Sequence, residues 1–112
     1  MEDKVKVWLF DVKKAIEEID SFVTTDRNFH EFRKDIKTKR AVERNIEIIG
    51  EAVNRIIGVH PEIAISNSRK IIDTRNRIIH GYDSVSEEIL WSIIVNNLPE
   101  LKQEIDILLS GT

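Results

Sequence analysis

The chain has 112 residues, of which 41% are hydrophobic and 33% are charged, a balance typical of a folded protein with a well-solvated surface. The net charge of −3 argues against a broadly basic nucleic-acid-binding surface, so any such contact must come from a local patch. The absence of cysteine excludes disulfides and thiolate metal sites, and without a signal-peptide pattern or a membrane-length apolar run we expect one cytoplasmic domain over residues 1–112.

The predicted elements are all helices, because apolar residues recur at three- and four-residue spacing almost throughout the chain. Only four glycines and two prolines interrupt this pattern, which also favours long helices over short strands. The first helix is predicted over about 2–23. A turn and an N-cap are expected to follow it, at Thr24, Thr25 and Asp26.

A short second helix is predicted near 28–36. The third helix is predicted to begin at a Thr38 cap and to run to about Ile57, with Gly58 as the residue just beyond its end. The stretch 59–66 contains a proline and is predicted to be a loop.

The fourth helix is predicted to start near Ser66 or Asn67 and to run to about His80, where Gly81 can stop it.

The last helical segment is predicted to start at Ser84 or Ser86. Within it, Pro99 either kinks the helix or opens a new one as its first residue. Five or six helices with no convincing strand predict an all-α fold, an antiparallel helical bundle. Because a domain of this size has a thin core, we also expect it to be dimeric.

Arg75 lies in the middle of a predicted apolar stripe on the fourth helix. At about 100° per residue, Ile71 and Ile78 fall within roughly 60° on one side of it, and Ile72 and Ile79 within roughly 60° on the other. A guanidinium in such a position is costly unless it is paired and hydrogen-bonded. We therefore expect other polar groups to hold Arg75 in place.

Asn45 falls inside the apolar face predicted for the third helix, and a buried amide must find hydrogen-bond partners. Arg75 and Asn45 are therefore candidates for one buried polar network, with Glu51 or Arg44 at its edge. This network has two interpretations. Either it fixes helix register or a dimer interface, or it belongs to a functional cleft in which Asn45 has a supporting role.

His80 shares one side of the fourth helix with Asp73 and Asn76, within an arc of roughly 60°. Arg75 lies about 140° from His80 in an ideal helix, so the two side chains point in different directions. Distortion at the helix end would narrow that angle. A two-fold dimer would instead set both residues against their copies across a shared groove, with Asp73 and Asn76 as supporting residues.

An arginine near a histidine suits the cleavage of RNA, which carries its own nucleophile, the 2′-hydroxyl. An imidazole can take the proton of that hydroxyl or donate one to the leaving 5′-oxygen, since its pKa lies near neutrality. A guanidinium can hold the phosphate and stabilise the charge of the transition state. The acidic residues form no convincing metal-ligand cluster, so we expect no metal and no other cofactor. By spacing alone, such an Arg/His pair is more typical of surface residues.

The segment 75–82, with the sequence RNRIIHGY, resembles the R-N-x-x-x-H-x-Y signature of the HepT-type toxins in the HEPN superfamily. The stretch RAVERNIEIIGEA at 40–52 resembles the third-helix block of that family, and WSIIVNNLPEL at 91–101 resembles its last-helix block. The resemblance covers nearly the whole chain in order and without large gaps.

The resemblance implies a helical bundle that dimerises, with the arginine and histidine motifs meeting in a cleft at the two-fold axis. It implies a metal-independent ribonuclease toxin of a type II- or VII-like toxin–antitoxin pair. The antitoxin is an MNT-type nucleotidyltransferase, which in some pairs transfers AMP from ATP to the motif tyrosine. By position, the resemblance gives Arg75 and His80 the catalytic roles, Asn76 a supporting polar role and Tyr82 the role of modification site.

Two alternatives remain open at this point. The chain can be a non-catalytic, substrate- or nucleotide-binding partner of a minimal nucleotidyltransferase, or a structural dimer with an inactive site.

The basic residues suggest where RNA would bind. The densest basic run lies around the start of the third helix and consists of Lys34, Lys37, Lys39, Arg40 and Arg44. A second group on the fourth helix extends it with Arg69, Lys70 and Arg77. Each is interpreted either as a solvated helix face or as a phosphate track. The candidate RNA-binding residues are Arg44, Arg69, Lys70 and Arg77.

Overall fold

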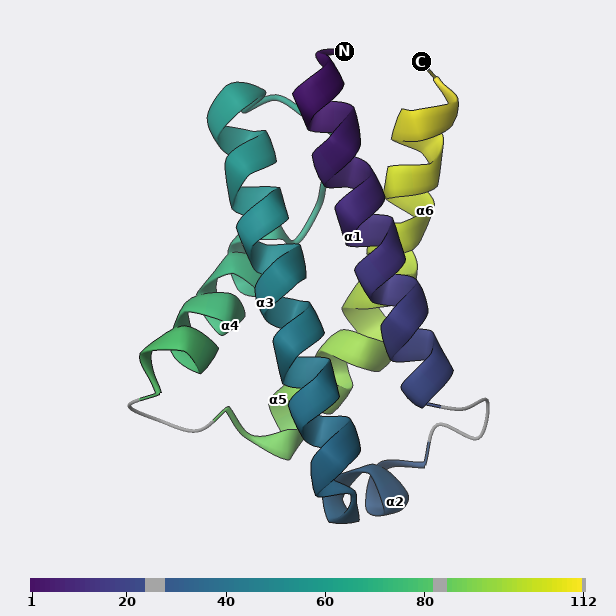
Figure 1. The fold of residues 1–112 in the computed structure, drawn as a ribbon, viewed down its shortest axis with the longest axis vertical. Helices are drawn as coiled ribbons and strands as arrows, with labels where there is room; N and C mark the ends of the chain where they lie inside the picture. Colours follow the sequence, from purple (N-terminus) through teal and green to yellow (C-terminus); the bar gives the residue numbers. More distant parts are fainter. Residues whose placement is uncertain (24–27, 82–84, 112) are drawn as a thin grey trace.

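The structure, a computed structural model, describes residues 1–23, 28–81 and 85–111, and these residues form helices and no strand. The elements are α1 (Asp3–Phe22), α2 (Phe29–Lys34), α3 (Ile36–Val59), α4 (Ser68–His80), α5 (Glu87–Ser92), the π-helical turn η1 (Ile93–Asn97) and α6 (Leu98–Ser110) (Figure 1). The predicted all-α class is therefore confirmed, while the turn predicted at 24–26 lies outside the described residues. None of the described helices is both long and apolar enough to cross a membrane.

The long helices lie side by side along the molecule (Figure 1). α1 contacts both α3 and α6 and runs antiparallel to each, and α4 packs against α3. α1 and α3 supply the centre of the core, because each presents an apolar stripe at three- and four-residue spacing. Burial of each large side chain contributes roughly 1.5–3 kcal/mol. The fully buried side chains of these two helices include Leu9, Ile16, Ile19, Ile46, Ile49 and Ile56.

The ends of α3 differ from the prediction. Asp35, and not Thr38, is its N-cap: Asp35 Oδ1 accepts from the Thr38 backbone N–H at 3.1 Å, and Oδ2 accepts from the Thr38 hydroxyl at 2.7 Å. The predicted stop at Gly58 is wrong, because the helix continues to Val59 and is capped by His60. The following Pro61 explains the actual end, since a residue that precedes a proline is disfavoured in the helical conformation.

The ends of α4 are close to the prediction. Asn67 is its N-cap, in a left-handed conformation with φ of 59°, and Gly81 ends the helix with φ of 66°. Just before the helix, the backbone N–H of Ser66 donates to Glu104 of α6 at 3.0 Å. The Ser66 hydroxyl lies 2.7 Å from carboxylate oxygens of both Glu100 and Glu104. These contacts tie the loop before α4 to α6.

The helical segment that contains Pro99 is continuous through α5, η1 and α6. It begins after Ser86, whose hydroxyl accepts from the Ile89 backbone N–H as predicted, and the alternative Ser84 lies outside the described residues. Pro99 lies in the first turn of α6 and is not its first residue. In the π turn before it, the Leu98 N–H donates to the Ile93 carbonyl, five residues back. The wide turn thus accommodates a residue that has no N–H of its own, and the chain continues without a break.

Aromatic side chains attach α2 to this last segment. Trp91 packs against Phe32 with ring centroids 5.4 Å apart and against Phe29 at 5.9 Å. Trp91 is half-buried, as is Trp8 of α1, and both pack against the core.

Candidate functional site

The buried side of α4 is rotated relative to the predicted stripe. Ile71, Ile72 and Thr74 are buried, whereas Ile79 is 49% exposed and Arg75 is half-buried. Arg75 therefore lies between the buried Ile71 and Ile72 as predicted, but it is not at the centre of the buried face. Its aliphatic stem reaches α3 at Gly50: a Cβ atom added to this glycine would lie 2.3 Å from the Arg75 Cβ.

The polar end of Arg75 is held by its neighbour in sequence. One Nη atom of Arg75 donates to the Asn76 side-chain carbonyl at 2.8 Å. The Nε atom of Arg75 is buried and has no hydrogen-bond partner among the described residues. Asn76, which shares the His80 side of the helix by spacing, thus contacts the guanidinium through its side chain.

Asn45 is buried as predicted, at 5% exposure, but its hydrogen bond stays within α3. Its amide nitrogen donates to the Ala41 carbonyl at 3.0 Å, one helical turn away. Its Oδ1 atom is buried and has no hydrogen-bond partner among the described residues. The hydrogen bonds of the described residues therefore do not join Asn45 to Arg75. The reason is local, because a short amide side chain in a helix can readily reach the carbonyl four residues earlier.

The two residues expected at the edge of that network are paired elsewhere on α3. Arg44 contacts Glu47 at 3.1 Å, and Glu51 contacts Arg55 at 2.7 Å.

His80 is the last residue of α4 and is exposed. The helix is regular up to this residue, and the Gly81 N–H donates to the Arg77 carbonyl at 3.2 Å. Distortion of the helix end therefore does not bring His80 to Arg75, and the angle of about 140° between them remains. The predicted modification site, Tyr82, lies outside the described residues.

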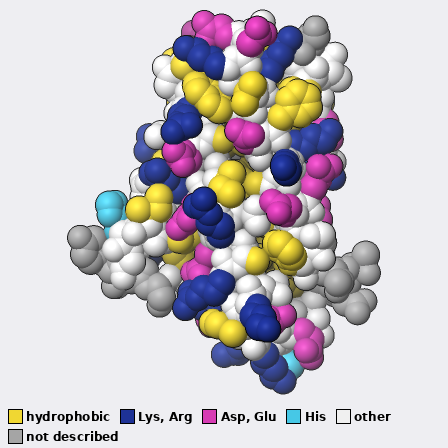
Figure 2. Space-filling model, viewed as in Figure 1, with side chains coloured by type: hydrophobic (Ala, Val, Ile, Leu, Met, Phe, Trp, Pro, Cys, Tyr) yellow, Lys and Arg dark blue, Asp and Glu magenta, His cyan; other side chains and the backbone are white. Residues whose placement is uncertain are grey.

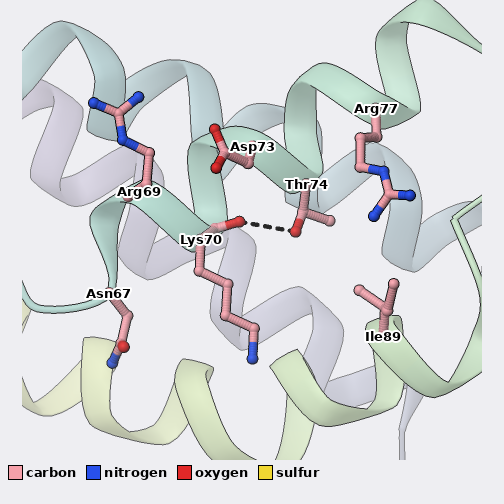
Figure 3. Close-up of a pocket in the computed structure, with 7 residues that line it drawn as sticks. All are labelled: Asn67, Arg69, Lys70, Asp73, Thr74, Arg77 and Ile89. Carbon is pink, nitrogen blue, oxygen red and sulfur yellow. Dashed lines mark hydrogen bonds between the residues drawn. The ribbon is translucent and has the colours of Figure 1, made fainter.

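A groove of about 560 Å³ lies between α4 and α5. It is lined by Asn67, Arg69, Lys70, Asp73, Thr74, Arg77 and Ile89. In Figure 3, Lys70 and Arg77 extend toward the side where Ile89 lies, while Arg69 extends in the opposite direction. The Thr74 hydroxyl donates its hydrogen to the Lys70 carbonyl at 2.8 Å, so this hydrogen is not available to a ligand in the groove.

The groove brings together three of the four predicted RNA-binding residues: Arg69, Lys70 and Arg77. Asp73, predicted as a supporting residue, also lines it. Arg75 and His80 do not line the groove, so α4 presents its cations in two different directions.

The basic run at the start of α3 is largely neutralised by acidic partners. Lys39 contacts Glu87 of α5 at 3.3 Å, and Arg40 contacts Glu43 at 2.7 Å. The pKa of the Glu87 carboxyl is lowered. The largest cause is a hydrogen bond from the backbone N–H of Glu87, and the next is the hydrogen bond from Lys39. On the face shown in Figure 2, basic and acidic side chains alternate over the upper and middle parts of the described residues, and several basic side chains gather at the lower end. Phosphate contacts through this run would have to compete with these carboxylates.

Sequence reasoning missed Gly50 as part of the site. A signal was present, because a glycine in the middle of a long helix costs roughly 1 kcal/mol relative to alanine and usually has a packing reason.

Within residues 1–23, 28–81 and 85–111, there is no group of three or more acidic or imidazole side chains that could hold a metal ion.

Comparison with known proteins places this chain in a family. The family model described as "Ribonuclease HepT-like" matches residues 12–108. The chain is 39% identical over 101 residues to the "Probable ribonuclease HepT" of Thermococcus cleftensis, covering 87% of this chain and 88% of the relative. It is 35% identical over 106 residues to the "Putative RNase MJ0127" of Methanocaldococcus jannaschii, covering 91% and 84%. No solved structure gives a significant match. The chain belongs to the HepT-like ribonuclease family of the HEPN superfamily.

Proposed function

We propose that residues 1–112 act as one domain, a metal-independent ribonuclease that is the toxin of a cytoplasmic toxin–antitoxin pair. The observation that carries the proposal is the half-buried Arg75, oriented by Asn76 and with its Nε atom lacking a hydrogen-bond partner among the described residues. A guanidinium held in this way is preorganised to bind a phosphate, with donors left for the ligand. Membership of a ribonuclease family supports the same chemistry.

In the proposed reaction, the 2′-hydroxyl of the RNA attacks the adjacent phosphorus and the bond to the 5′-oxygen breaks. One proton leaves the 2′-hydroxyl and one reaches the departing 5′-oxygen. His80 makes one of these two transfers, and water makes the other. Arg75 balances the negative charge that grows on the phosphoryl oxygens. The products are a 2′,3′-cyclic phosphate and a 5′-hydroxyl.

A homodimer provides the arrangement that this reaction needs. Within one regular α4, Arg75 and His80 point about 140° apart, so one chain does not direct both side chains at one phosphate. Across a two-fold axis, Arg75 of one protomer can face His80 of its partner. The exposed Ile79, about 40° from Arg75 around α4, gives this face an apolar group for a second copy to bury.

The groove between α4 and α5 is proposed to carry the RNA strand toward this cleft. Lys70 and Arg77 supply a local positive patch on a chain whose net charge is −3, and Arg69 is proposed to contact RNA at the rim of the groove. This patch offers phosphate contacts without a basic surface elsewhere. Arg44 is proposed as a further contact once RNA displaces its partner Glu47.

The activity can be tested by incubating the purified chain with fluorescent RNA in EDTA and separating the products by electrophoresis. We expect cleavage by the parent chain and large losses in Arg75→Ala and His80→Ala. Matched controls are Arg55→Ala and His30→Ala, which replace exposed residues outside the site. Cleavage at the parent rate by both site variants would contradict the proposal. Binding of RNA or nucleotide without cleavage would favour a non-catalytic partner subunit.

The shared site predicts that two inactive variants complement each other. In a mixed dimer of Arg75→Ala and His80→Ala chains, one of the two clefts contains both an intact arginine and an intact histidine. With random exchange of protomers, we expect about a quarter of the parent activity to return. If the two residues acted within one chain, every cleft of the mixed dimer would lack one of them, and no activity would return.

We further propose that an MNT-type nucleotidyltransferase inhibits the chain by transferring AMP from ATP to Tyr82. The tyrosine oxygen attacks the α-phosphorus, pyrophosphate leaves, and a bulky anion is placed two residues beyond His80, where it repels RNA. The test is mass spectrometry of the chain after incubation with ATP and the nucleotidyltransferase encoded beside it. The expected gain of one AMP disappears in Tyr82→Phe. A chain that is inhibited without this gain in mass would show inhibition by binding alone.

A further inference from the structure

Gly50 lies near the middle of α3, is buried, and faces α4. A Cβ atom added to it would lie 2.3 Å from Cβ and 2.7 Å from Cγ of Arg75, and 3.4 Å from the Ile71 carbonyl oxygen. The two short contacts involve the base of the arginine side chain. Because the position of Cβ is fixed by the backbone of α4, rotation of the side chain cannot relieve the first of them.

We propose that Gly50 is a positioning residue for Arg75, an inference that rests on the proposed role of Arg75 in cleavage. The missing side chain at Gly50 allows α4 to approach α3 closely enough to place the arginine stem directly on the α3 backbone. Within the described part of the chain, one hydrogen bond, to Asn76, fixes the polar end, and the Nε atom has no partner there. The packing of the stem on Gly50 therefore determines where the guanidinium lies.

The contact distances indicate how far an alanine at this position would displace the arginine. Carbon atoms pack at roughly 3.5–4.0 Å, so α3 and α4 would have to separate by about 1 Å or more at this point. The nearby Ile71 carbonyl limits sliding along α4 as a way to avoid the clash. A catalytic group misplaced by about 1 Å can lose about 100-fold in rate.

The same helix supplies a matched control. Gly58 also lies within α3, but a Cβ atom added to it would meet nothing within 4 Å. Gly50→Ala and Gly58→Ala therefore make the same chemical change on one helix, and only the first one touches Arg75.

The experiment measures kcat, RNA affinity and the Nε–H signal of Arg75 in ¹⁵N NMR, which is assigned by its loss in Arg75→Lys. In Gly50→Ala we expect kcat to fall about 100-fold, RNA Kd to stay close to the parent value and the Nε–H signal to shift. Gly58→Ala should match the parent in all three. A parent-like kcat and an unshifted signal in Gly50→Ala would overturn the inference.

Two further variants keep the test decisive. If Arg75→Ala cleaves RNA like the parent, the proposed function fails, and the NMR shift still decides whether Gly50 positions the arginine. If Gly50→Ala does not fold, combining it with Arg75→Gly removes both clashing atoms and should restore a cooperative unfolding transition. A double variant that remains unfolded would show that the clash is not with residue 75, and would overturn the inference.

Discussion

Replacing one cation of the groove between α4 and α5 should change how RNA binding depends on salt. Two of the basic side chains that line the groove, Lys70 and Arg77, extend toward the same side. If each contacts one phosphate of a single strand, the slope of log affinity against log salt is about −1.4. Raising the salt from about 50 to about 200 mM should then weaken binding by roughly sevenfold. In Arg77→Gln, one contact remains, the slope becomes about −0.7, and the same change in salt weakens binding by roughly 2.6-fold.

The assay is fluorescence anisotropy with a labelled 2′-O-methyl RNA, which binds but lacks the attacking hydroxyl. The matched control is Arg55→Gln on α3, which replaces an arginine that is paired with Glu51 and does not line the groove. Asp73→Asn should strengthen binding, because it removes the one carboxylate in the groove lining. Equal slopes for Arg77→Gln, the control and the parent would refute the assignment of RNA to this groove.

Four predictions concern stability and are checked by urea unfolding. The side-chain and backbone hydrogen bonds from Thr38 lower the pKa of Asp35, so its stabilisation is present above the unfolded pKa and is lost as the pH falls through the lower folded pKa. The stability advantage of the parent over Asp35→Ala should therefore shrink below about pH 4, and a constant difference down to about pH 2 would contradict this. Gly81→Ala should lower the free energy of unfolding by roughly 1–2 kcal/mol, because its φ is +66°. Gly58→Ala, in open space within a helix, should raise it by up to about 1 kcal/mol. Ile49→Ala should cost about 2–5 kcal/mol, because this side chain is fully buried in the core.

The fold was accessible from the sequence because its helices are long and strongly periodic. The stripe of α1, from Val5 to Ile19, predicts both the helix and the face that it buries. The errors lie at helix ends, where a single hydrogen bond decides the outcome. Thr38 was predicted as the cap of α3, whereas the carboxylate of Asp35 accepts from the Thr38 backbone N–H. Gly58 resembled a stop signal, but the helix passes through it because glycine permits helical as well as left-handed angles.

The site was less predictable, because it depends on which helix faces which. Periodicity placed Arg75 in the apolar stripe, but the packing of α4 against α3 rotated the stripe and left Ile79 half-exposed. The groove combines α4 with Ile89 of α5, and sequence periodicity does not reveal which helices pack together. The contact at Gly50 is tertiary as well, so sequence spacing alone does not reveal it.

The π turn η1 decides which face of α6 meets the core. A turn of this kind holds one residue more than an α-helical turn, and it sets the rotational phase of everything that follows. If the same residues were wound as an ordinary α-helix, α6 would be rotated by about 100° about its axis. Leu101 and Ile105 would then leave the core for water. Deleting one residue of the turn, for example Val95, would remove the wide turn and keep the face of α6 that packs against α1, whereas inserting a further residue would rotate that face away from the core.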